Sequence, residues 1–227
     1  MQIRSVLFIV GVLLVCVGAS LVLPLGVSLW YGDGAFLGLL SSLVIMVGGG
    51  LALAYTNRSQ TPLNLTLRDG FAVVGICWIV ASFAGGLPFV LTSTASVTDA
   101  VFEAASGFTT TGATIFADIE GLPHGLLMWR SLTHWIGGLG IILLSLIVLP
   151  LLGVGGMQLY RAEVDGGPTA RTQQSTPAAG RRTPPLTLWR VYCLMTIVLT
   201  VLLYIAGMDW FDALTTAFDR GDGGFST

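Results

Sequence analysis

Five long apolar stretches constrain the fold of this chain more than any other feature of its sequence. A helix needs roughly 20 mainly apolar residues to cross the hydrocarbon core of a bilayer, and each stretch offers that length. Only 10% of the residues are charged, whereas soluble domains carry roughly 25%. The sequence therefore predicts an all-α polytopic membrane protein with membrane lipid as a partner. The predicted spans are residues 5–30, 35–55, 70–91, 125–152 and 186–207.

The arginines indicate which ends of these spans face the cytoplasm. If the five spans alternate in direction, eight of the ten basic residues fall on one side. Basic residues accumulate on the cytoplasmic side of membrane proteins, so we expect a multi-pass protein of the cell membrane with a cytoplasmic N-terminus. The basic residues form no polybasic segment, and we expect no nucleic acid partner. The arginines on the predicted cytoplasmic side are Arg4, Arg58, Arg68, Arg161, Arg171, Arg181, Arg182 and Arg190.

A hydroxyl-rich loop lies between the third and fourth predicted spans. It reads Ser106-Gly-Phe-Thr-Thr-Thr-Gly-Ala-Thr114 and follows residues 93–105, whose capping residues and helix formers predict one short helix. Non-helical backbone is tolerated at membrane depth only where it is buried in protein or lines a cavity. Carbonyl oxygens there can replace the water shell of a cation, and the C-terminal end of a helix adds partial negative charge. The loop therefore indicates a cation filter.

A second copy of this pattern follows the fifth span. Residues 209–218 predict another short helix, and Gly223-Gly224-Phe225 comes after it. Both copies begin from the same side, so they predict a parallel repeat around an axis along the membrane normal, which is the symmetry of a pore. The second copy is one residue shorter, and Asp222 stands where the first copy has a threonine. We expect this departure to distort the second filter.

Three stretches carry a resemblance to a known family. They are the loop at 106–114, residues 122–140 with the sequence LPHGLLMWRSLTHWIGGLG, and residues 149–163 with the sequence LPLLGVGGMQLYRAE. Together they resemble the Trk/Ktr/HKT potassium transporter superfamily, most closely the N-terminal half of its TrkH membrane subunits. The resemblance implies K⁺ channel-like units of helix, pore helix and helix. It assigns residues 1–60 to two additional N-terminal helices, 61–160 to the first unit, 161–185 to a cytoplasmic linker and 186–227 to the start of a second, incomplete unit.

The resemblance also implies site residues and partners. K⁺ would be the transported ion, with no cofactor in this chain. The implied partners are a second copy of the chain in a homodimer and a cytoplasmic, TrkA-like nucleotide-binding regulatory subunit. Glycine is needed in such a filter because it adopts backbone conformations in which other residues are strained. The implied filter residues are Thr110, Thr111, Gly112, Ala113, Thr114, Gly223, Gly224 and Phe225.

Two functional interpretations follow from these patterns. The first is potassium uptake across the cell membrane, with this chain as part of the pore-forming subunit. The second is a truncated, transport-inactive fragment that only associates with full-length partners, because the sequence ends at Thr227 inside the second predicted filter. The sequence predicts no enzyme, because its Ser, His and acidic residues form neither a nucleophile elbow nor an HExxH motif. Potassium, rather than sodium, rests on the resemblance alone.

Two ionisable residues of the fourth predicted span call for an explanation. Arg130 and His134 lie one helical turn apart near its predicted outer end, and ionisable groups within membrane spans are often functional. A role in cation coordination or gating is one interpretation. The favoured interpretation is structural pairing of these groups with Glu103, Asp118 or Glu120. A metal site built on His134 and a second histidine, His124, lacks a third ligand at suitable spacing.

Overall fold

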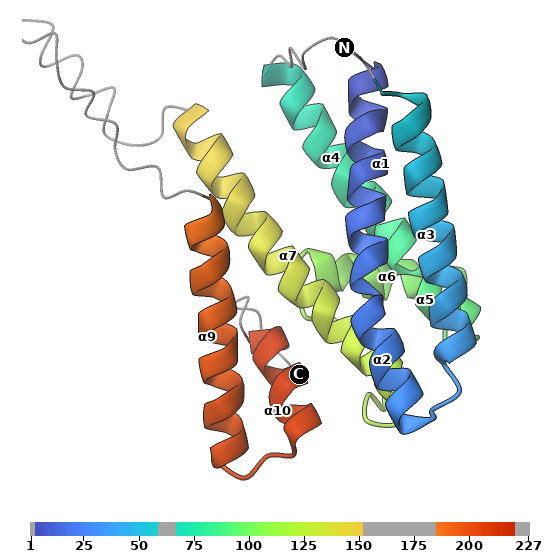
Figure 1. Cartoon of the computed structure of the whole chain (residues 1–227), viewed down its shortest axis with the longest axis vertical. Helices are drawn as coiled ribbons and strands as arrows, with labels where there is room; N and C mark the ends of the chain where they lie inside the picture. Colours follow the sequence, from blue (N-terminus) through green and yellow to red (C-terminus); the bar gives the residue numbers. More distant parts are fainter. Residues whose placement is uncertain (1–2, 59–66, 152–184, 221–227) are drawn as a thin grey trace, which may run out of the picture.

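The computed structural model describes residues 3–58, 67–151 and 185–220, and the regular secondary structure of these residues is all helical (Figure 1). The fold class predicted from the sequence is therefore confirmed. The predicted linker and the end of the second unit lie outside the described residues, and the proposed domain boundaries stay predictions. The helices are α1 (Ile3–Ser20), α2 (Val22–Tyr31), α3 (Phe36–Thr56), α4 (Leu67–Gly85), α5 (Leu87–Leu91), α6 (Val97–Phe108), α7 (His124–Leu151), α9 (Pro185–Ile205) and α10 (Trp210–Arg220).

The five predicted spans correspond to long helical segments. Three of them, Ile3–Tyr31, Phe36–Thr56 and Gly70–Leu91, are long and apolar enough to cross a membrane. The fourth and fifth correspond to α7, with 28 residues, and α9, with 21. Large apolar side chains such as Leu37, Phe83 and Met195 are exposed on these helices, which is the surface expected of helices that face lipid.

Two of the predicted spans are broken by proline. The sequence predicted one helix over residues 5–30, yet the helix is interrupted at Leu21, three residues before Pro24. The span over residues 70–91 is interrupted at Gly86, two residues before Pro88. A proline ring has no N–H to donate and collides with the carbonyl four residues earlier, so each proline interrupts the preceding helix and lies in the first turn of the next one.

The long helices run alternately up and down the molecule. Figure 1 shows the start of α1, the end of α3, the start of α4, the end of α7 and the start of α9 directed toward one end. Arg4, Arg58 and Arg190 lie close to these helix ends, as the orientation argument requires. The loop between α2 and α3 and the loop that leads into α7 lie at the opposite end.

Close contact between α1 and α3 depends on glycine. A side-chain carbon at Gly11 would lie 2.6 Å from the Ala54 nitrogen, and one at Gly50 would lie 2.8 Å from the Gly11 oxygen. Small residues allow helix backbones to approach closely in membranes. The adjacent glycines Gly48 and Gly49 differ from Gly50, since a side-chain carbon at either would have nothing within 4 Å, so of these three only Gly50 makes the close contact.

The short helix α6 packs between α4 and α7 in the interior of the molecule (Figure 1). A side-chain carbon at Gly137 of α7 would lie 2.1 Å from the Phe108 carbonyl oxygen, and one at Gly107 of α6 would lie 2.1 Å from the Thr133 hydroxyl. Phe108 itself is 2% exposed. These contacts fix the C-terminal end of α6, and so the start of the hydroxyl-rich loop, against the middle of α7.

Candidate functional site

The helix α6 begins with a side-chain cap of the kind that the sequence predicted. Ser96 has an extended backbone, its hydroxyl accepts a hydrogen bond from the Asp99 N–H at 3.3 Å, and the same hydroxyl donates to the Asp99 carboxylate at 2.7 Å. A hydroxyl at this position satisfies one of the free N–H groups of the first helical turn. The acidic Asp99 in that turn also suits the positive end of the helix dipole.

The other end of α6 turns sharply into the loop. The Thr110 N–H donates to the Gly107 carbonyl and the Thr111 N–H to the Ser106 carbonyl, both at 2.9 Å. This pair of bonds defines a Schellman motif, whose left-handed residue is usually glycine. Here that residue is Thr110, with φ 55°, and a β-branched side chain in this region costs about 1–3 kcal/mol. The loop therefore begins with a strained residue at its first predicted filter position.

Gly112 supplies the second left-handed residue of the loop, with φ 76°. The segment from Thr111 to Thr114 has no regular secondary structure, so its carbonyls are not used by a helix or strand. Thr111 and Ala113 are exposed, whereas Gly112 is buried. The structure thus puts a glycine in the conformation that glycine favours, in an irregular segment directly after a short helix.

Three threonine hydroxyls at the end of α6 and in the loop are engaged within the protein. The Thr109 and Thr111 hydroxyls lie 2.8 Å apart, and that of Thr109 also donates to the Ala105 carbonyl at 2.7 Å. The Thr114 hydroxyl donates to the Glu103 carboxylate and accepts from the Phe116 N–H at 3.2 Å. With these three hydroxyls engaged, the backbone carbonyls of the irregular segment are the oxygens that we consider for a ligand.

Glu103 is the buried anchor of the loop. Its side chain is 1% exposed, and its two carboxylate oxygens lie 3.1 and 3.0 Å from the Thr114 hydroxyl. The carboxylate also accepts the Ile115 N–H at 3.1 Å and the Arg130 Nε–H at 2.7 Å. A buried carboxylate is tolerated when a countercharge and hydrogen bonds surround it, and here both are present.

Arg130 connects this anchor to the second short helix. Its guanidinium Nη1 lies 3.9 Å from the Asp219 carboxylate of α10, and His134 Nδ1 lies 3.7 Å from the same carboxylate. His134 Nδ1 also lies 3.1 Å from the Arg130 carbonyl oxygen. The predicted pairing of Arg130 with Glu103 is confirmed.

The other two proposed acidic partners are Glu120, which lines a cavity together with Arg130, and Asp118. The Asp118 carboxylate accepts the N–H of Gly121 at 3.1 Å within its own turn. His124 stacks on Tyr31, with ring centroids 3.9 Å apart. Asp219 was not among the partners predicted from the sequence, because it lies 89 positions after Arg130 and no local pattern brings the two together.

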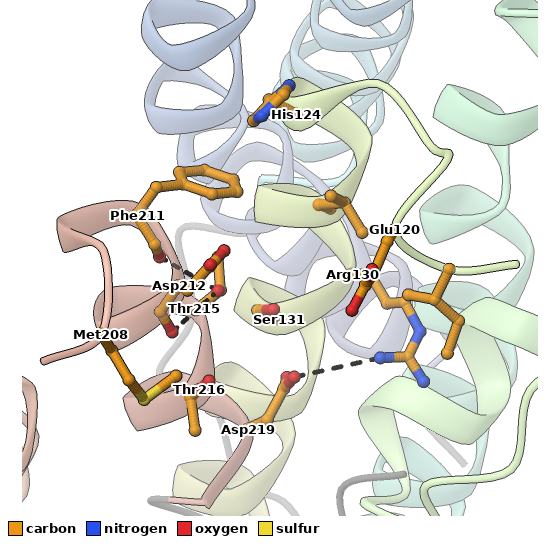
Figure 2. A pocket seen from close by; sticks show the side chains of 12 residues that line it. Glu120, His124, Arg130, Ser131, Met208, Phe211, Asp212, Thr215, Thr216 and Asp219 are labelled. Atoms are coloured by element: carbon orange, nitrogen blue, oxygen red, sulfur yellow. Dashed lines mark hydrogen bonds and ion pairs between the residues drawn. The ribbon is translucent and has the colours of Figure 1, made fainter. Parts of the chain in front are cut away.

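A cavity of about 430 Å³ lies between the first half of α7 and α10. Figure 2 shows Arg130 and Ser131 on one side of it and Asp212, Thr215 and Asp219 on the other, with an ion pair joining Arg130 to Asp219. Charged and hydroxyl groups thus line a space with room for several water molecules, and Arg130 connects it to Glu103, the anchor of the loop. The cavity walls come from both predicted units.

The second predicted filter lies beyond the described residues. The short helix α10 is present at Trp210–Arg220, as the internal repeat predicted, and it packs against α9 and α7. Asp222, Gly223, Gly224 and Phe225 all lie outside the described residues. Of the predicted filter residues, the structure therefore places Thr110, Thr111, Gly112, Ala113 and Thr114, and brings them together in one loop.

The chain is similar to known proteins over nearly its whole length. It is 40% identical over 230 residues to the Trk system potassium uptake protein TrkH of Halomonas elongata, covering all of this chain and 47% of that protein. It is 39% identical over the same length to TrkH of Escherichia coli K12 and 36% identical over 231 residues to the TrkG protein of that strain, covering 47% and 46% of them. The chain therefore spans about half the length of these relatives.

A solved structure has the same fold. The crystal structure of the potassium transporter TrkH from Vibrio parahaemolyticus superposes with a TM-score of 0.80 at 35% identity, covering 96% of this chain and 42% of that one. The family model for TrkH, described as a cation transport protein, matches residues 40–227. The matched range includes the loop at 110–114, its Glu103 anchor and α10. By sequence and by fold, this chain belongs to the TrkH family of membrane-embedded cation transport proteins.

Proposed function

We propose that this chain takes part in potassium uptake across the cell membrane as a pore-forming component of a Trk-type transporter. The observation that carries the proposal is the irregular loop at Thr110–Thr114, which follows the C-terminal end of α6 and turns at left-handed Gly112. Backbone carbonyls that no helix or strand uses can bind a dehydrated cation. The relatives named as potassium uptake proteins support K⁺ as the ion.

The charges around the loop suit weak and reversible cation binding. Glu103 is the acidic group in direct contact with the loop, and Arg130 neutralises it at 2.7 Å. An unpaired carboxylate beside a filter would hold a cation strongly, whereas conduction needs binding weak enough for release. The loop therefore attracts the ion through carbonyl dipoles and the negative end of α6.

The proposal includes the filter residues, the orientation in the membrane and the assembly of the whole transporter. K⁺ would pass the carbonyls of Thr110, Thr111, Gly112, Ala113 and Thr114 and those of Gly223, Gly224 and Phe225 in the second unit. The N-terminus faces the cytoplasm, and the loop opens to the outside. A homodimer with a TrkA-like cytoplasmic regulatory subunit is the proposed assembly, supported by the Trk system names of the relatives.

Rubidium uptake in cells that lack their own potassium uptake systems tests the proposal. Cells that express the chain should accumulate Rb⁺, and an excess of K⁺ should suppress this uptake more than an equal excess of Na⁺. The relatives are about twice as long as this chain, so the same cells are also tested with a TrkH relative. Uptake with the relative but none with this chain would instead favour the transport-inactive interpretation.

A further inference from the structure

We propose that Glu103 and Arg130 are positioning residues that hold the first filter loop in register and couple it to the second short helix, α10. The inference deepens the proposed function, since it rests on the 110–114 loop being the filter. It concerns how the loop keeps its shape, and that can be measured without any transport. Three observations carry it.

The first observation is that Glu103 contacts both the side chain and the backbone of the loop. Its carboxylate receives the Thr114 hydroxyl at 3.0 and 3.1 Å and the Ile115 N–H at 3.1 Å. These two residues close the filter segment at the end away from α6. The other end is held by the Schellman bonds of Thr110 and Thr111. Glu103 therefore fixes the span over which the loop carbonyls are arranged.

The second observation is that Arg130 is the buried countercharge of Glu103 and holds it toward the loop. Both side chains are at least nine-tenths buried, and a buried charge without a partner is strongly disfavoured. The Arg130 Nε–H takes one carboxylate oxygen at 2.7 Å, which leaves the other facing Ile115. The backbone of Arg130 is held in turn, because its carbonyl accepts the Thr133 hydroxyl at 2.6 Å.

The third observation is that the same guanidinium also faces α10. Arg130 Nη1 lies 3.9 Å from the Asp219 carboxylate (Figure 2), a separation for a through-space attraction rather than a hydrogen bond. His134 approaches the same carboxylate at 3.7 Å. A displacement of α10 would change the field at Arg130, and hence the strength of its hold on Glu103. The Arg130 guanidinium thus interacts both with the anchor of the first loop and with the second short helix.

Hydrogen–deuterium exchange of the segment 109–116, measured on the whole chain in lipid nanodiscs, tests the inference directly. Glu103→Gln replaces one oxygen by a donor group, which cannot satisfy Arg130, Thr114 and Ile115 together. We expect Glu103→Gln and Arg130→Gln to speed exchange in this segment about tenfold, as expected for a lost hydrogen bond to a charged group. Asp99→Asn is the matched control, because Asp99 lies one turn earlier on α6, is half-buried, and has its carboxylate bonded to the Ser96 hydroxyl at the start of that helix.

A charge swap separates positioning of the loop from simple ion pairing. In Glu103→Arg with Arg130→Glu, the buried pair is restored, but the Ile115 N–H has no acceptor. We expect the swapped protein to regain its folded yield while exchange at 109–116 stays fast. Full recovery of the slow exchange would show that the pair serves only to stabilise the fold, and would overturn the inference.

Thr114→Val tests the positioning of the loop by Glu103 if the Glu103 variants fail to fold. It removes the hydroxyl that contacts Glu103, leaves the buried ion pair intact and changes side-chain volume little. Because this hydroxyl also accepts the Phe116 N–H, exchange is compared over residues 109–115. Faster exchange there supports the inference, and unchanged exchange contradicts it.

A parallel measurement of Rb⁺ against Na⁺ uptake separates this inference from the proposed function. Where uptake is observed, Glu103→Gln should lower the Rb⁺/Na⁺ ratio and Asp99→Asn should not; a ratio unchanged in Glu103→Gln would overturn the link to the filter. If the unmodified chain takes up no Rb⁺ but the exchange results are as expected, the proposal that this chain transports K⁺ is contradicted, whereas the proposed positioning role of Glu103 and Arg130 is supported.

Discussion

At the scale of single residues, backbone conformation distinguishes this loop from the helices around it. Thr110 and Gly112 both have positive φ values, and only one other non-glycine residue among those described, Ser93, shares that property. The Schellman bonds account for Thr110, but they do not account for Gly112. A left-handed residue inside an irregular segment turns the next carbonyl in a direction that other residues reach only with strain. Gly112 therefore controls where the loop oxygens point.

Substitution of Gly112 tests this control. Gly112→Ala should cost about 1 kcal/mol of folding free energy, because alanine is disfavoured at positive φ. If the loop is the filter, it should also reduce the Rb⁺/Na⁺ uptake ratio severalfold. Gly34→Ala is the matched control, since Gly34 has φ 78° in the loop between α2 and α3 with nothing within 4 Å. Equal effects of the two substitutions on the ratio would contradict a special role for Gly112.

At the scale of elements, the position of α6 depends on how closely it approaches α7. The Phe108 carbonyl lies over Gly137, and the Gly107 backbone lies over Thr133. Behind α6, Phe108 also contacts Gly85 of α4, and the buried Trp129 indole donates to the Gly85 carbonyl at 2.9 Å, beside the break between α4 and α5. The end of α6 is thus packed tightly between α4 and α7, and this packing fixes where the following loop begins.

Enlarging Gly137 should displace α6. A side-chain carbon there would lie 2.1 Å from the Phe108 oxygen, so Gly137→Ala should destabilise the protein by about 1–3 kcal/mol, as overpacking does. Thermal unfolding in detergent, followed by tryptophan fluorescence, measures the loss. Gly140→Ala, one turn later on α7, is the control, because its nearest neighbours are ring carbons of Trp78 at 3.7 and 3.8 Å. A stability loss as large for Gly140→Ala as for Gly137→Ala would argue against this tight packing.

At the scale of the whole molecule, the N-terminal helices are joined to both units at one end. The Asp33 carboxylate, in the loop before α3, accepts the Gly125 N–H in the first turn of α7 at 2.7 Å. Tyr31 stacks on His124, and Phe211 of α10 packs against both rings with centroids 5.5 and 5.1 Å away. This aromatic contact brings α2, α7 and α10 together at the end that we propose faces outward.

The direction of insertion can be tested by labelling. With Cys16, Cys77 and Cys193 replaced by serine, Glu120→Cys and Asn57→Cys place single thiols at opposite ends of the molecule. The arginine distribution predicts that a membrane-impermeant maleimide labels Glu120→Cys in intact cells and labels Asn57→Cys only after the membrane is opened. The reverse pattern would place the 110–114 loop toward the cytoplasm and contradict the proposed direction of uptake.

The sequence by itself determined the elements and the order in which they occur. Apolar runs of sufficient length predicted the long helices, a serine cap predicted the start of α6, and the spacing of hydroxyls and glycine predicted the irregular loop. These features are local, since each depends on residues within a few turns of one another. The resemblance to a family came from the same short stretches, and the comparisons confirmed it.

Only the tertiary structure decided which of the buried polar groups meet. Arg130 had three candidate acids in the sequence, and packing selected Glu103 and added Asp219 from a distant helix. Likewise, of Gly48, Gly49 and Gly50, only Gly50 contacts α1 closely. The Thr114 hydroxyl donates to the Glu103 carboxylate. These outcomes depend on helix rotation and depth, which are set by contacts between segments far apart in the chain. The residues that give the loop its chemistry are therefore determined by the local sequence, whereas the shape of the loop is maintained by the packing of α6, α7 and α10.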